Sequence, residues 1–470
     1  MKSKSEEETK HNIHVSWEIL LELRRRNNTT RKHLQKGENS SQTNQMTNLN
    51  IMRLLWIWFC VPAVCFASHT LNFHGHKVIQ IELETEEHVK IIKSMDKTFN
   101  FDFWSPDSSS CIAPGMTVDF HIHANQTEAV LHLLKQNSIH YEVLFHDLQA
   151  GIEAQRDNSR LQKSRKHKYN KYNDWETIVQ WMGEMTTKHS DLVRRIKIGK
   201  TYEGRTMYVL RVGKSSIDGP AIFMDCGIHA REWISPAFCQ WFVRELVSGY
   251  SKDEGIKKLL TNLNFYILPV INIDGYIYTW TEDRMWRKNR SPASDGPCVG
   301  TDLNRNFNIS WCEIGASDYS CTEIYCGKSP GSEEETKNVV NFISNRLKSI
   351  KAYISIHAYS QLLLYPYSYT FNPAPNSQEL DEIAKGAISK LSSLYKTLYS
   401  YGPSASTIYP TSGSSDDWAY SQGIQYAFTF ELRDTGKHGF LLPESKIKAT
   451  CKETTLAVQY IANYVLSHIS

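Results

Sequence analysis

The sequence predicts an α/β protein in which helices cover both faces of a mixed, largely parallel sheet. From Tyr169 onward, continuous apolar runs of strand length alternate with helix-length segments, a pattern typical of strands that are buried on both sides. Polar residues that could carry chemistry follow three of these runs, namely His229, His357 and Glu431. Because ligands of open α/β sheets bind beyond the carboxyl ends of the strands, these residues mark a candidate site.

The individual elements justify this class in order along the chain. The apolar runs predict strands at Val193–Ile198, Met207–Val212, Ala221–Met224, Phe265–Val270, Tyr353–Ile356 and Tyr426–Phe430. The segments between and around them predict helices at Trp175–His189, Ser235–Ser248, Glu333–Ile350, Glu379–Leu398 and Lys452–His468.

A smaller α/β unit is predicted before this part. Val78–Leu83 alternates apolar and polar residues like a half-buried strand, and Glu86–Phe99 has helical periodicity. The remaining elements are strands at Phe101–Trp104, Met116–Ile122 and Tyr141–Phe145 and a helix at Thr127–Leu134. Their order indicates a compact unit of its own.

The segment Ala154–Lys168 is polar, basic and poor in β-branched residues, which predicts an exposed connector. It is either a simple linker or a site of proteolytic activation, because several Arg and Lys residues stand in a stretch without predicted structure.

The N-terminal region contains one targeting signal. Met52 and Arg53 precede an apolar run, Leu54–Ala67, that is shorter than the roughly 20 residues of a membrane helix and ends in small residues. This pattern predicts a secretory signal peptide over residues 52–68, with a buried core helix as the alternative. Residues 1–51 are rich in charged and polar residues, which predicts a disordered extension. Because a signal peptide normally stands at the start of a chain, we expect Met52 to be the true start and residues 1–51 to be an artefact of the gene model.

Composition excludes some classes of protein. The formal net charge of +3 is too small to indicate a nucleic-acid partner. The mean hydropathy of −0.44 argues against a polytopic membrane protein. Of the 10 cysteines, Cys60 and Cys65 lie in the predicted signal; in an exported chain most of the others should be oxidised, but their spacing leaves the pairing open. Asn125 and Asn308 begin glycosylation acceptor motifs, which matter only if the chain is secreted.

The strongest chemical signal is the pair His229 and Glu232, three positions apart after the predicted strand Ala221–Met224. This pair is half of a zinc site that lacks one more imidazole. Taken singly, a His or Glu at a strand end is usually a surface or hydrogen-bonded residue. Together with His357 and Glu431, however, two imidazoles and two carboxylates reach one rim of the sheet, which indicates a functional site.

Six motifs carry a resemblance to a known family and occur in its order. They are His229–Ser235, Met285–Arg290, Gly300–Phe307, Ile356–Ser360, Thr407–Pro410 and Phe430–Gly436. Over about Val78–Ser470 the chain resembles the zinc metallocarboxypeptidases of the pancreatic A/B type, most closely the B-type proenzymes. The resemblance implies a small open-sandwich α/β activation propeptide domain with its basic connector at residues 69–165, followed by a zinc carboxypeptidase catalytic domain at residues 166–470.

For the metal centre, the resemblance implies one Zn²⁺ per chain, held by His229, Glu232 and His357. A His₂Glu set of this kind leaves a fourth position for water or substrate. The resemblance also implies that Asp302 orients the imidazole of His229.

For the chemistry, the resemblance implies Glu431 as the general base and Arg287 as the group that stabilises the oxyanion. Asn304, Arg305 and Tyr409 are implied to hold the free carboxylate of the substrate, with Arg305 able to form a bidentate pair.

Substrate contacts further from the scissile bond are implied for Arg231 and Tyr359, and Asp416 and Ser368 match the specificity pocket of B-type enzymes. A buried carboxylate at Asp416 would favour a terminal Lys or Arg, because a cation relieves its desolvation. The alternative for Asp416 is a capping role in its own turn. Ser404 replaces the glycine usual in B-type enzymes, and we expect it to narrow the pocket slightly.

Disulfide pairs can be assigned to the cysteines only from the resemblance. It implies the disulfides Cys226–Cys239, Cys298–Cys321 and Cys312–Cys326 and a free thiol at Cys451, and it leaves Cys111 without an evident partner.

The sequence thus predicts the secreted zymogen of a zinc exopeptidase that removes C-terminal Lys or Arg. Storage in secretory granules before release is compatible with this prediction. Its expected partners are peptide or protein C-termini and an activating trypsin-like protease that cleaves at Arg165, Arg160 or Lys163; no nucleic-acid or membrane partner is expected. One alternative is a plasma-type basic carboxypeptidase that acts on fibrin-like substrates. Another is a non-catalytic binding protein on the same scaffold, which the complete set of ligands and base argues against.

Overall fold

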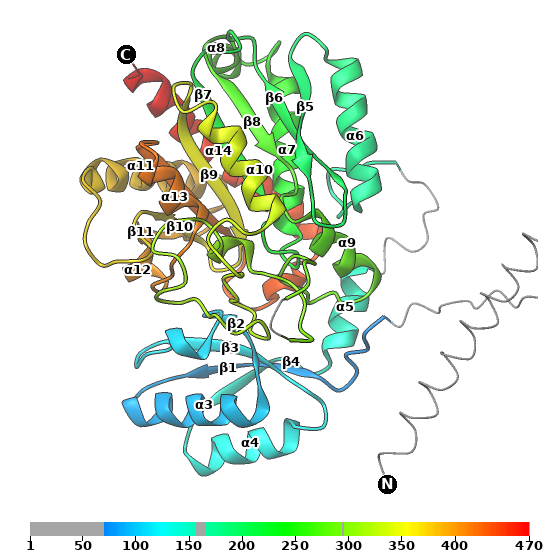
Figure 1. Ribbon diagram of the computed structural model, residues 1–470, viewed down its shortest axis with the longest axis vertical. Helices are drawn as coiled ribbons and strands as arrows, with labels where there is room; N and C mark the ends of the chain where they lie inside the picture. Colours follow the sequence, from blue (N-terminus) through cyan, green and yellow to red (C-terminus); the bar gives the residue numbers. More distant parts are fainter. Residues whose placement is uncertain (1–69, 157–165, 294–295, 470) are drawn as a thin grey trace, which may run out of the picture. The chain divides into compact units, whose positions relative to one another are not determined.

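The computed structural model describes residues 70–156, 166–293 and 296–469. The predicted signal peptide, the extension before it and the three candidate cleavage sites lie outside the described residues. The described chain contains two sheets, one of 4 strands in an N-terminal part (residues 70–156) and one of 8 strands in a C-terminal part (residues 166–469) (Figure 1).

The N-terminal part is an antiparallel sheet with two helices on one face (Figure 1). Its strand order is β2-β3-β1-β4, with β1 Lys77–Glu82, β2 Asp102–Ser105, β3 Thr117–Ile122 and β4 Tyr141–Phe145. The helices are α3 Glu86–Phe99 and α4 Thr127–Gln136. The alternation in β1 separates its two faces: Ile79 and Ile81 pack in the core beneath the helices, whereas Val78 packs in the core shared with the C-terminal part.

The C-terminal sheet is mixed, with three parallel pairs at its centre and a fourth at one edge. The strand order is β11-β10-β12-β9-β7-β8-β6-β5. The strands are β5 Val193–Lys200, β6 Thr206–Val212, β7 Ala221–Cys226, β8 Asn264–Leu268, β9 Ile350–Ala358, β10 Leu362–Tyr365, β11 Ser400–Pro403 and β12 Tyr426–Leu432. Strands β7 and β8 are buried throughout, which explains their apolar runs Ala221–Met224 and Phe265–Leu268.

Helices cover this sheet on both faces, with α10 in front of it and α14 behind it in Figure 1. The larger helices are α6 Trp175–Lys188, α7 Ile234–Gly249, α8 Glu254–Asn262, α9 Ile273–Thr281, α10 Glu334–Ser344, α11 Ser377–Tyr395 and α14 Glu444–His468. The predicted fold class is therefore confirmed. No helix among the described residues is long and apolar enough to cross a membrane.

Some predicted boundaries are wrong, and two of them bear on the site. The helix predicted over Glu333–Ile350 ends at Ser344, because Ile350 already pairs with Ala221 as the first residue of β9. Strands β9 and β12 run further than predicted, so that His357 and Glu431 lie inside the last residues of their strands rather than after them.

Other differences arise from local capping. The helix predicted over Glu379–Leu398 stops at Tyr395, because Lys396 adopts the left-handed conformation with φ 60°. The last helix begins at Glu444, directly after Pro443, rather than at Lys452.

The short strands β10 and β11 and the helix α5 Leu148–Arg156 were not predicted. The connector prediction is wrong for residues 154–156, which belong to α5. There the buried Gln155 donates hydrogen bonds to the carbonyl oxygens of Phe440 and Leu442, so tertiary contacts extend the helix into a polar sequence.

Candidate active site

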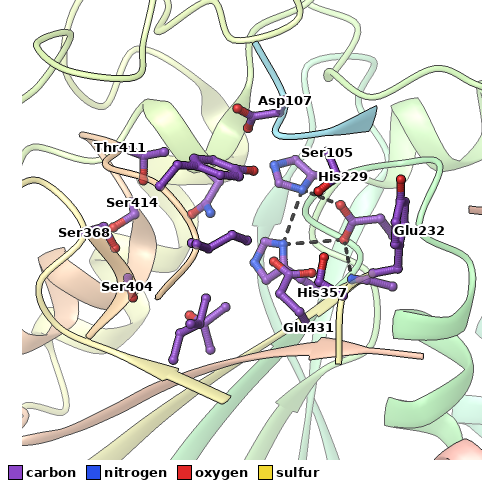
Figure 2. A pocket seen from close by; sticks show the side chains of 18 of the residues that line it. Ser105, Asp107, His229, Glu232, His357, Ser368, Ser404, Thr411, Ser414 and Glu431 are labelled. Carbon is purple, nitrogen blue, oxygen red and sulfur yellow. Dashed lines mark hydrogen bonds and ion pairs between the residues drawn. The ribbon is translucent and has the colours of Figure 1, made fainter. Parts of the chain in front are cut away.

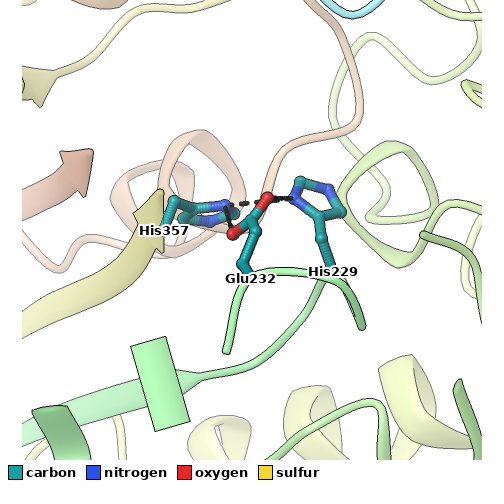
Figure 3. Close-up of side chains that lie close together, drawn as sticks. All are labelled: His229, Glu232 and His357. Carbon is teal, nitrogen blue, oxygen red and sulfur yellow. Dashed lines mark hydrogen bonds and ion pairs between the residues drawn. The ribbon is translucent and has the colours of Figure 1, made fainter. Parts of the chain in front are cut away.

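Two imidazoles and a carboxylate converge where β7 and β9 end (Figure 3). Nδ1 of His229 lies 2.6 Å from Glu232 Oε1, and Nδ1 of His357 lies 3.4 Å from Glu232 Oε2. The two Nδ1 atoms are 3.3 Å apart. Among the described residues, this is the one group of three or more possible ligands whose donor atoms all lie within 4.8 Å of one another.

The backbone between β7 and α7 places His229 and Glu232. Gly227 directly follows β7 with φ +63°, and a Cβ there would lie 2.9 Å from Cγ of Pro236 in α7. Glycine thus allows the sharp turn and the close approach of the helix. The disulfide Cys226–Cys239 ties the end of the strand to the same helix.

The donor set fits a catalytic zinc ion. His229, Glu232 and His357 are all buried, and two imidazole nitrogens with one carboxylate form a known set of protein ligands that leaves one position open. Burial opposes ionisation of Glu232, but the two imidazoles outweigh it and lower the pKa of this carboxyl. A carboxylate is therefore available at the point where the imidazole nitrogens meet.

Asp302 lies behind the first histidine. Its Oδ1 is 3.2 Å from Nε2 of His229, and its Oδ2 accepts hydrogen bonds from Nε and Nη2 of Arg287 at 3.1 Å and 2.8 Å. Although burial works against the charge, Arg287 and His229 hold the pKa of Asp302 well below its usual value. Asp302 can thus fix both the imidazole and the guanidinium.

Glu431 faces the same cavity from β12, where it pairs in register with His357 of β9 (Figure 2). Burial raises its pKa to about 8; the imidazole of His357 opposes this shift and the carboxylate of Glu232 adds to it. A carboxyl group with a pKa near neutrality can both take up and release a proton.

Two arginines in the cavity share an acidic partner from the N-terminal part. Asp107, which follows β2, accepts hydrogen bonds from Nη2 of Arg287 at 2.9 Å and from Nη2 of Arg305 at 2.5 Å. All three side chains are buried. Asp107 was not predicted as a site residue. Its one signal in the sequence is an acid after a predicted strand of the N-terminal unit, and only the fold brings that acid to the arginines.

Two further residues of the predicted site are also held by the N-terminal part. Nη1 of Arg231 donates to Asp102 at 2.8 Å and its Nη2 donates to the carbonyl of Phe103 at 3.2 Å. The hydroxyl of Tyr359 donates to Asp119 at 2.6 Å. These contacts occupy the hydrogen-bonding groups that were predicted to meet substrate.

The remaining predicted residues line the same cavity. It is bordered by Asn304, Ser368, Ser404, Tyr409 and Asp416 together with His229, Glu232 and His357, which are called the triad below. Asn304 Oδ1 accepts a hydrogen bond from the backbone N–H of Ser415 at 3.0 Å, which fixes the side chain beside Arg305. The Ser404 hydroxyl, predicted to narrow the pocket, donates to the carbonyl of Tyr365 at 3.1 Å.

Asp416 is a buried acid in this cavity. It lies in helix α13 Ser415–Ser421, is 3% exposed, and its Oδ2 accepts a hydrogen bond from the Thr429 hydroxyl at 3.0 Å. The neighbouring Asp417 instead accepts from the backbone N–H groups of Ser368 and Tyr369 at 2.8 Å and 3.2 Å. The two adjacent acids therefore differ, since one supports a loop and the other lines the cavity.

The disulfides of the described chain are the pairs implied by the resemblance. They are Cys226–Cys239, Cys298–Cys321 and Cys312–Cys326. Cys111 and Cys451 are buried free thiols, as the resemblance implied for Cys451.

Comparison with known proteins identifies two families along the chain. The sequence profile described as "Zinc carboxypeptidase" matches residues 178–457, and the one described as "Carboxypeptidase activation peptide" matches residues 79–155. Carboxypeptidase B of Homo sapiens is 54% identical over 398 residues, which are 85% of this chain and 95% of that protein. Mast cell carboxypeptidase A of Mus musculus is 51% identical over 416 residues, covering 88% of this chain and 100% of that protein.

Among solved structures, the crystal structure of thrombin activatable fibrinolysis inhibitor superposes with a TM-score of 0.80 at 42% identity, covering 84% of this chain and 100% of that chain. The agreement extends over both parts of the described chain. With its activation peptide, its catalytic Zn²⁺ and its carboxypeptidase B relatives, the chain belongs to the zinc carboxypeptidase family and is the zymogen of a B-like metallocarboxypeptidase.

Proposed function

We propose that the activated enzyme hydrolyses the C-terminal peptide bond of peptides that end in Lys or Arg. The observation that carries this proposal is the buried carboxylate of Asp416 in the cavity that also holds Arg305 and the triad. A buried acid without a permanent cation favours a substrate side chain that brings one, and disfavours an apolar side chain that leaves it desolvated.

The carboxylate of the substrate terminus is proposed to sit on Arg305, with Asn304 and Tyr409 beside it. In the zymogen Asp107 places a carboxylate on Arg305, which supports a role for this guanidinium group in binding the carboxylate of the substrate. Requiring both a terminal carboxylate and a side-chain cation would restrict cleavage to the last residue.

His229, Glu232 and His357 are proposed to hold Zn²⁺, which when bound polarises a carbonyl oxygen and lowers the pKa of water. Glu431 then accepts the proton of the attacking water and delivers it to the leaving amine. Arg287, held in place by Asp302, donates hydrogen bonds to the oxygen on which negative charge develops.

We also propose that the chain is exported through its signal at residues 52–68 and is activated by a trypsin-like protease in the basic connector, at Arg165, Arg160 or Lys163. Support comes from the match to an activation peptide and from the contacts of Asp102, Asp107 and Asp119 with the site. N-terminal sequencing of the secreted and the activated protein would give both cleavage positions. A secreted protein that still begins before Met52 would contradict the signal assignment.

One alternative remains a plasma-type basic carboxypeptidase, since one superposed structure is the thrombin activatable fibrinolysis inhibitor. That protein is 42% identical, whereas human carboxypeptidase B is 54% identical. The hypothesis of a carboxypeptidase B-like enzyme is therefore favoured over the plasma-type alternative. Both readings share the site and the preference for basic termini.

The decisive experiment uses the purified zymogen treated with trypsin and peptides that end in Arg, Lys, Phe or Leu. We expect hydrolysis of the Arg and Lys peptides that a zinc chelator abolishes and added Zn²⁺ restores. In Asp416→Val, the kcat/KM ratio of Arg to Phe peptides should fall about 100-fold or more, because the buried cation loses its partner. An unchanged ratio in a variant with full zinc content would refute the specificity assignment.

A further inference from the structure

His357 of the triad is linked to two further residues by hydrogen bonds at Nε2, the ring nitrogen that faces away from Glu232 and His229. Nε2 of His357 lies 2.9 Å from the hydroxyl oxygen of Ser355, two residues earlier in β9. The same hydroxyl donates a hydrogen bond to Oδ1 of Asp225 at 2.9 Å. The three residues are fully or almost fully buried, so the bonds are shielded from water.

The direction of these bonds is fixed by counting protons. A serine hydroxyl has one proton, and an ionised carboxylate can only accept. Since Ser355 donates its proton to Asp225, its oxygen must accept from His357, and the proton of the neutral imidazole therefore sits on Nε2. That tautomer leaves the lone pair of Nδ1 free, and Nδ1 is the atom that faces Glu232 and His229.

The sheet holds Asp225 in this role. Asp225 of β7 pairs in register with Ser355 of the neighbouring strand β9, so the two side chains lie on the same face. Its other oxygen, Oδ2, accepts a hydrogen bond from the hydroxyl of Tyr353. Burial and the adjacent carboxylate raise the pKa of Tyr353 well above its usual value, so this hydroxyl stays protonated as a donor.

We propose that Asp225 is a positioning residue for zinc binding, acting through Ser355 to fix the ring and the tautomer of His357. The arrangement parallels that of His229, whose Nε2 faces Asp302 directly. Each imidazole ligand would thus be backed by a buried carboxylate, one in direct contact and the other through a hydroxyl. Partners of this kind raise ligand basicity and hold the ring in place. The proposal rests on the metal ligands proposed above.

The test measures zinc affinity of the full-length zymogen by competition with a chromophoric chelator, after removal of the metal. We expect Ser355→Ala to raise the dissociation constant for Zn²⁺ by about 10- to 100-fold, the usual effect of losing such a partner. Ser355→Thr, which keeps the hydroxyl, should restore the affinity of the wild type. Asp274→Asn is the matched control, because Asp274 is a buried carboxylate that accepts hydrogen bonds from Thr201, Glu203 and Arg205 rather than from the triad.

The variant Asp225→Asn distinguishes an effect that passes through the hydrogen bonds of Ser355 from a general effect on protein stability. If Asp225 acts through Ser355, the double variant Ser355→Ala/Asp225→Asn should bind Zn²⁺ about as tightly as Ser355→Ala alone. A merely structural role would lower the thermal midpoint of the metal-free protein and leave the dissociation constant unchanged.

Two results would overturn the proposal: a dissociation constant of Ser355→Ala within about threefold of the wild type, or effects of the two single variants that multiply in the double variant. Failure of the ligand assignment itself would look different. In that case His357→Ala would also leave zinc affinity intact, whereas a correct triad requires His357→Ala to abolish binding.

Discussion

The two glutamates of the candidate site, Glu232 and Glu431, have opposite pKa shifts although desolvation acts to raise the pKa of both. The imidazoles of His229 and His357 lower the pKa of Glu232, so it is a carboxylate ready to bind a cation. Burial raises the pKa of Glu431 to about 8, so it can carry a proton near neutrality. The same residue type can therefore serve as a metal ligand or as a base, because neighbouring groups set the pKa of each carboxyl.

The first prediction concerns the base. Glu431→Gln keeps the shape of the side chain but removes the proton acceptor, and we expect kcat/KM for an Arg peptide to fall by about 10²- to 10⁴-fold after activation. Zinc content should stay at one ion per chain, because Glu431 is not among the triad. Activity close to the wild type with full zinc content would exclude Glu431 as the base.

At the scale of elements, helix α10 has an unusual acid in its first turn. Glu335 is buried, accepts a hydrogen bond from the backbone N–H of Tyr202 at 3.1 Å and another from Nδ2 of Asn289 at 3.2 Å. Burial still raises its pKa to about 7, from a usual value of 4.5. The folded protein therefore binds this proton more tightly than the unfolded chain does.

That difference predicts how stability depends on pH. Between pH 4.5 and about 7 the folded state holds more protons at Glu335 than the unfolded state, so its contribution to the free energy of unfolding falls as pH rises. Glu335→Gln should remove this loss. The free energy of unfolding of the variant minus that of the wild type should therefore be larger at pH 8 than at pH 4, by at most about 3 kcal/mol. Urea unfolding at both pH values measures it. A difference between the proteins that does not change with pH would contradict the assignment.

Helix α13 holds the loop that contains Ser368 and Tyr369 through hydrogen bonds to Asp417. Asp417→Ala leaves the backbone N–H groups of Ser368 and Tyr369 without their acceptor, at a cost of about 1–3 kcal/mol for each buried donor. We expect lower stability in urea and a raised KM for Arg peptides, with unchanged zinc affinity. A KM equal to that of the wild type would show that the loop is positioned without this acid.

At the scale of the whole molecule, the activation peptide places three acids on four side chains of the site. Asp102 accepts from Arg231, Asp119 accepts from Tyr359, and Asp107 accepts from both Arg287 and Arg305. The N-terminal part therefore occupies three guanidinium groups and one hydroxyl that are proposed to act on substrate.

This arrangement predicts the effect of a single change on the uncut zymogen. Asp107→Ala frees the two guanidinium groups, and we expect measurable hydrolysis of a small Arg peptide before trypsin treatment, where the wild type shows none or far less. Glu128→Gln, on the exposed surface of α4, is the control with the same loss of charge. Equal activity of the three uncut proteins would show that blocking does not depend on Asp107.

Much of the fold could be predicted from the sequence because its central strands contain apolar runs, such as Ala221–Met224, that are typical of strands buried on both faces. The boundaries that failed depend on tertiary contacts: Ile350 is a strand residue because Ala221 pairs with it, and Gln155 is helical because two distant carbonyl groups accept its hydrogen bonds. Such partners are far away in sequence and leave no local pattern.

The sequence by itself determined the class of the fold and, through its motifs, the family and the donor set His229, Glu232 and His357. These are local facts, since each motif contains the residues that define it. Only the tertiary structure decided which residues hydrogen-bond to the proposed ligands and which occupy the site in the zymogen. Asp225 and Ser355 form the hydrogen bonds behind His357, and Asp107 accepts hydrogen bonds from Arg287 and Arg305. The physical reason is that a carboxylate acquires its role from the donors that surround it, and only folding brings those donors within hydrogen-bonding distance.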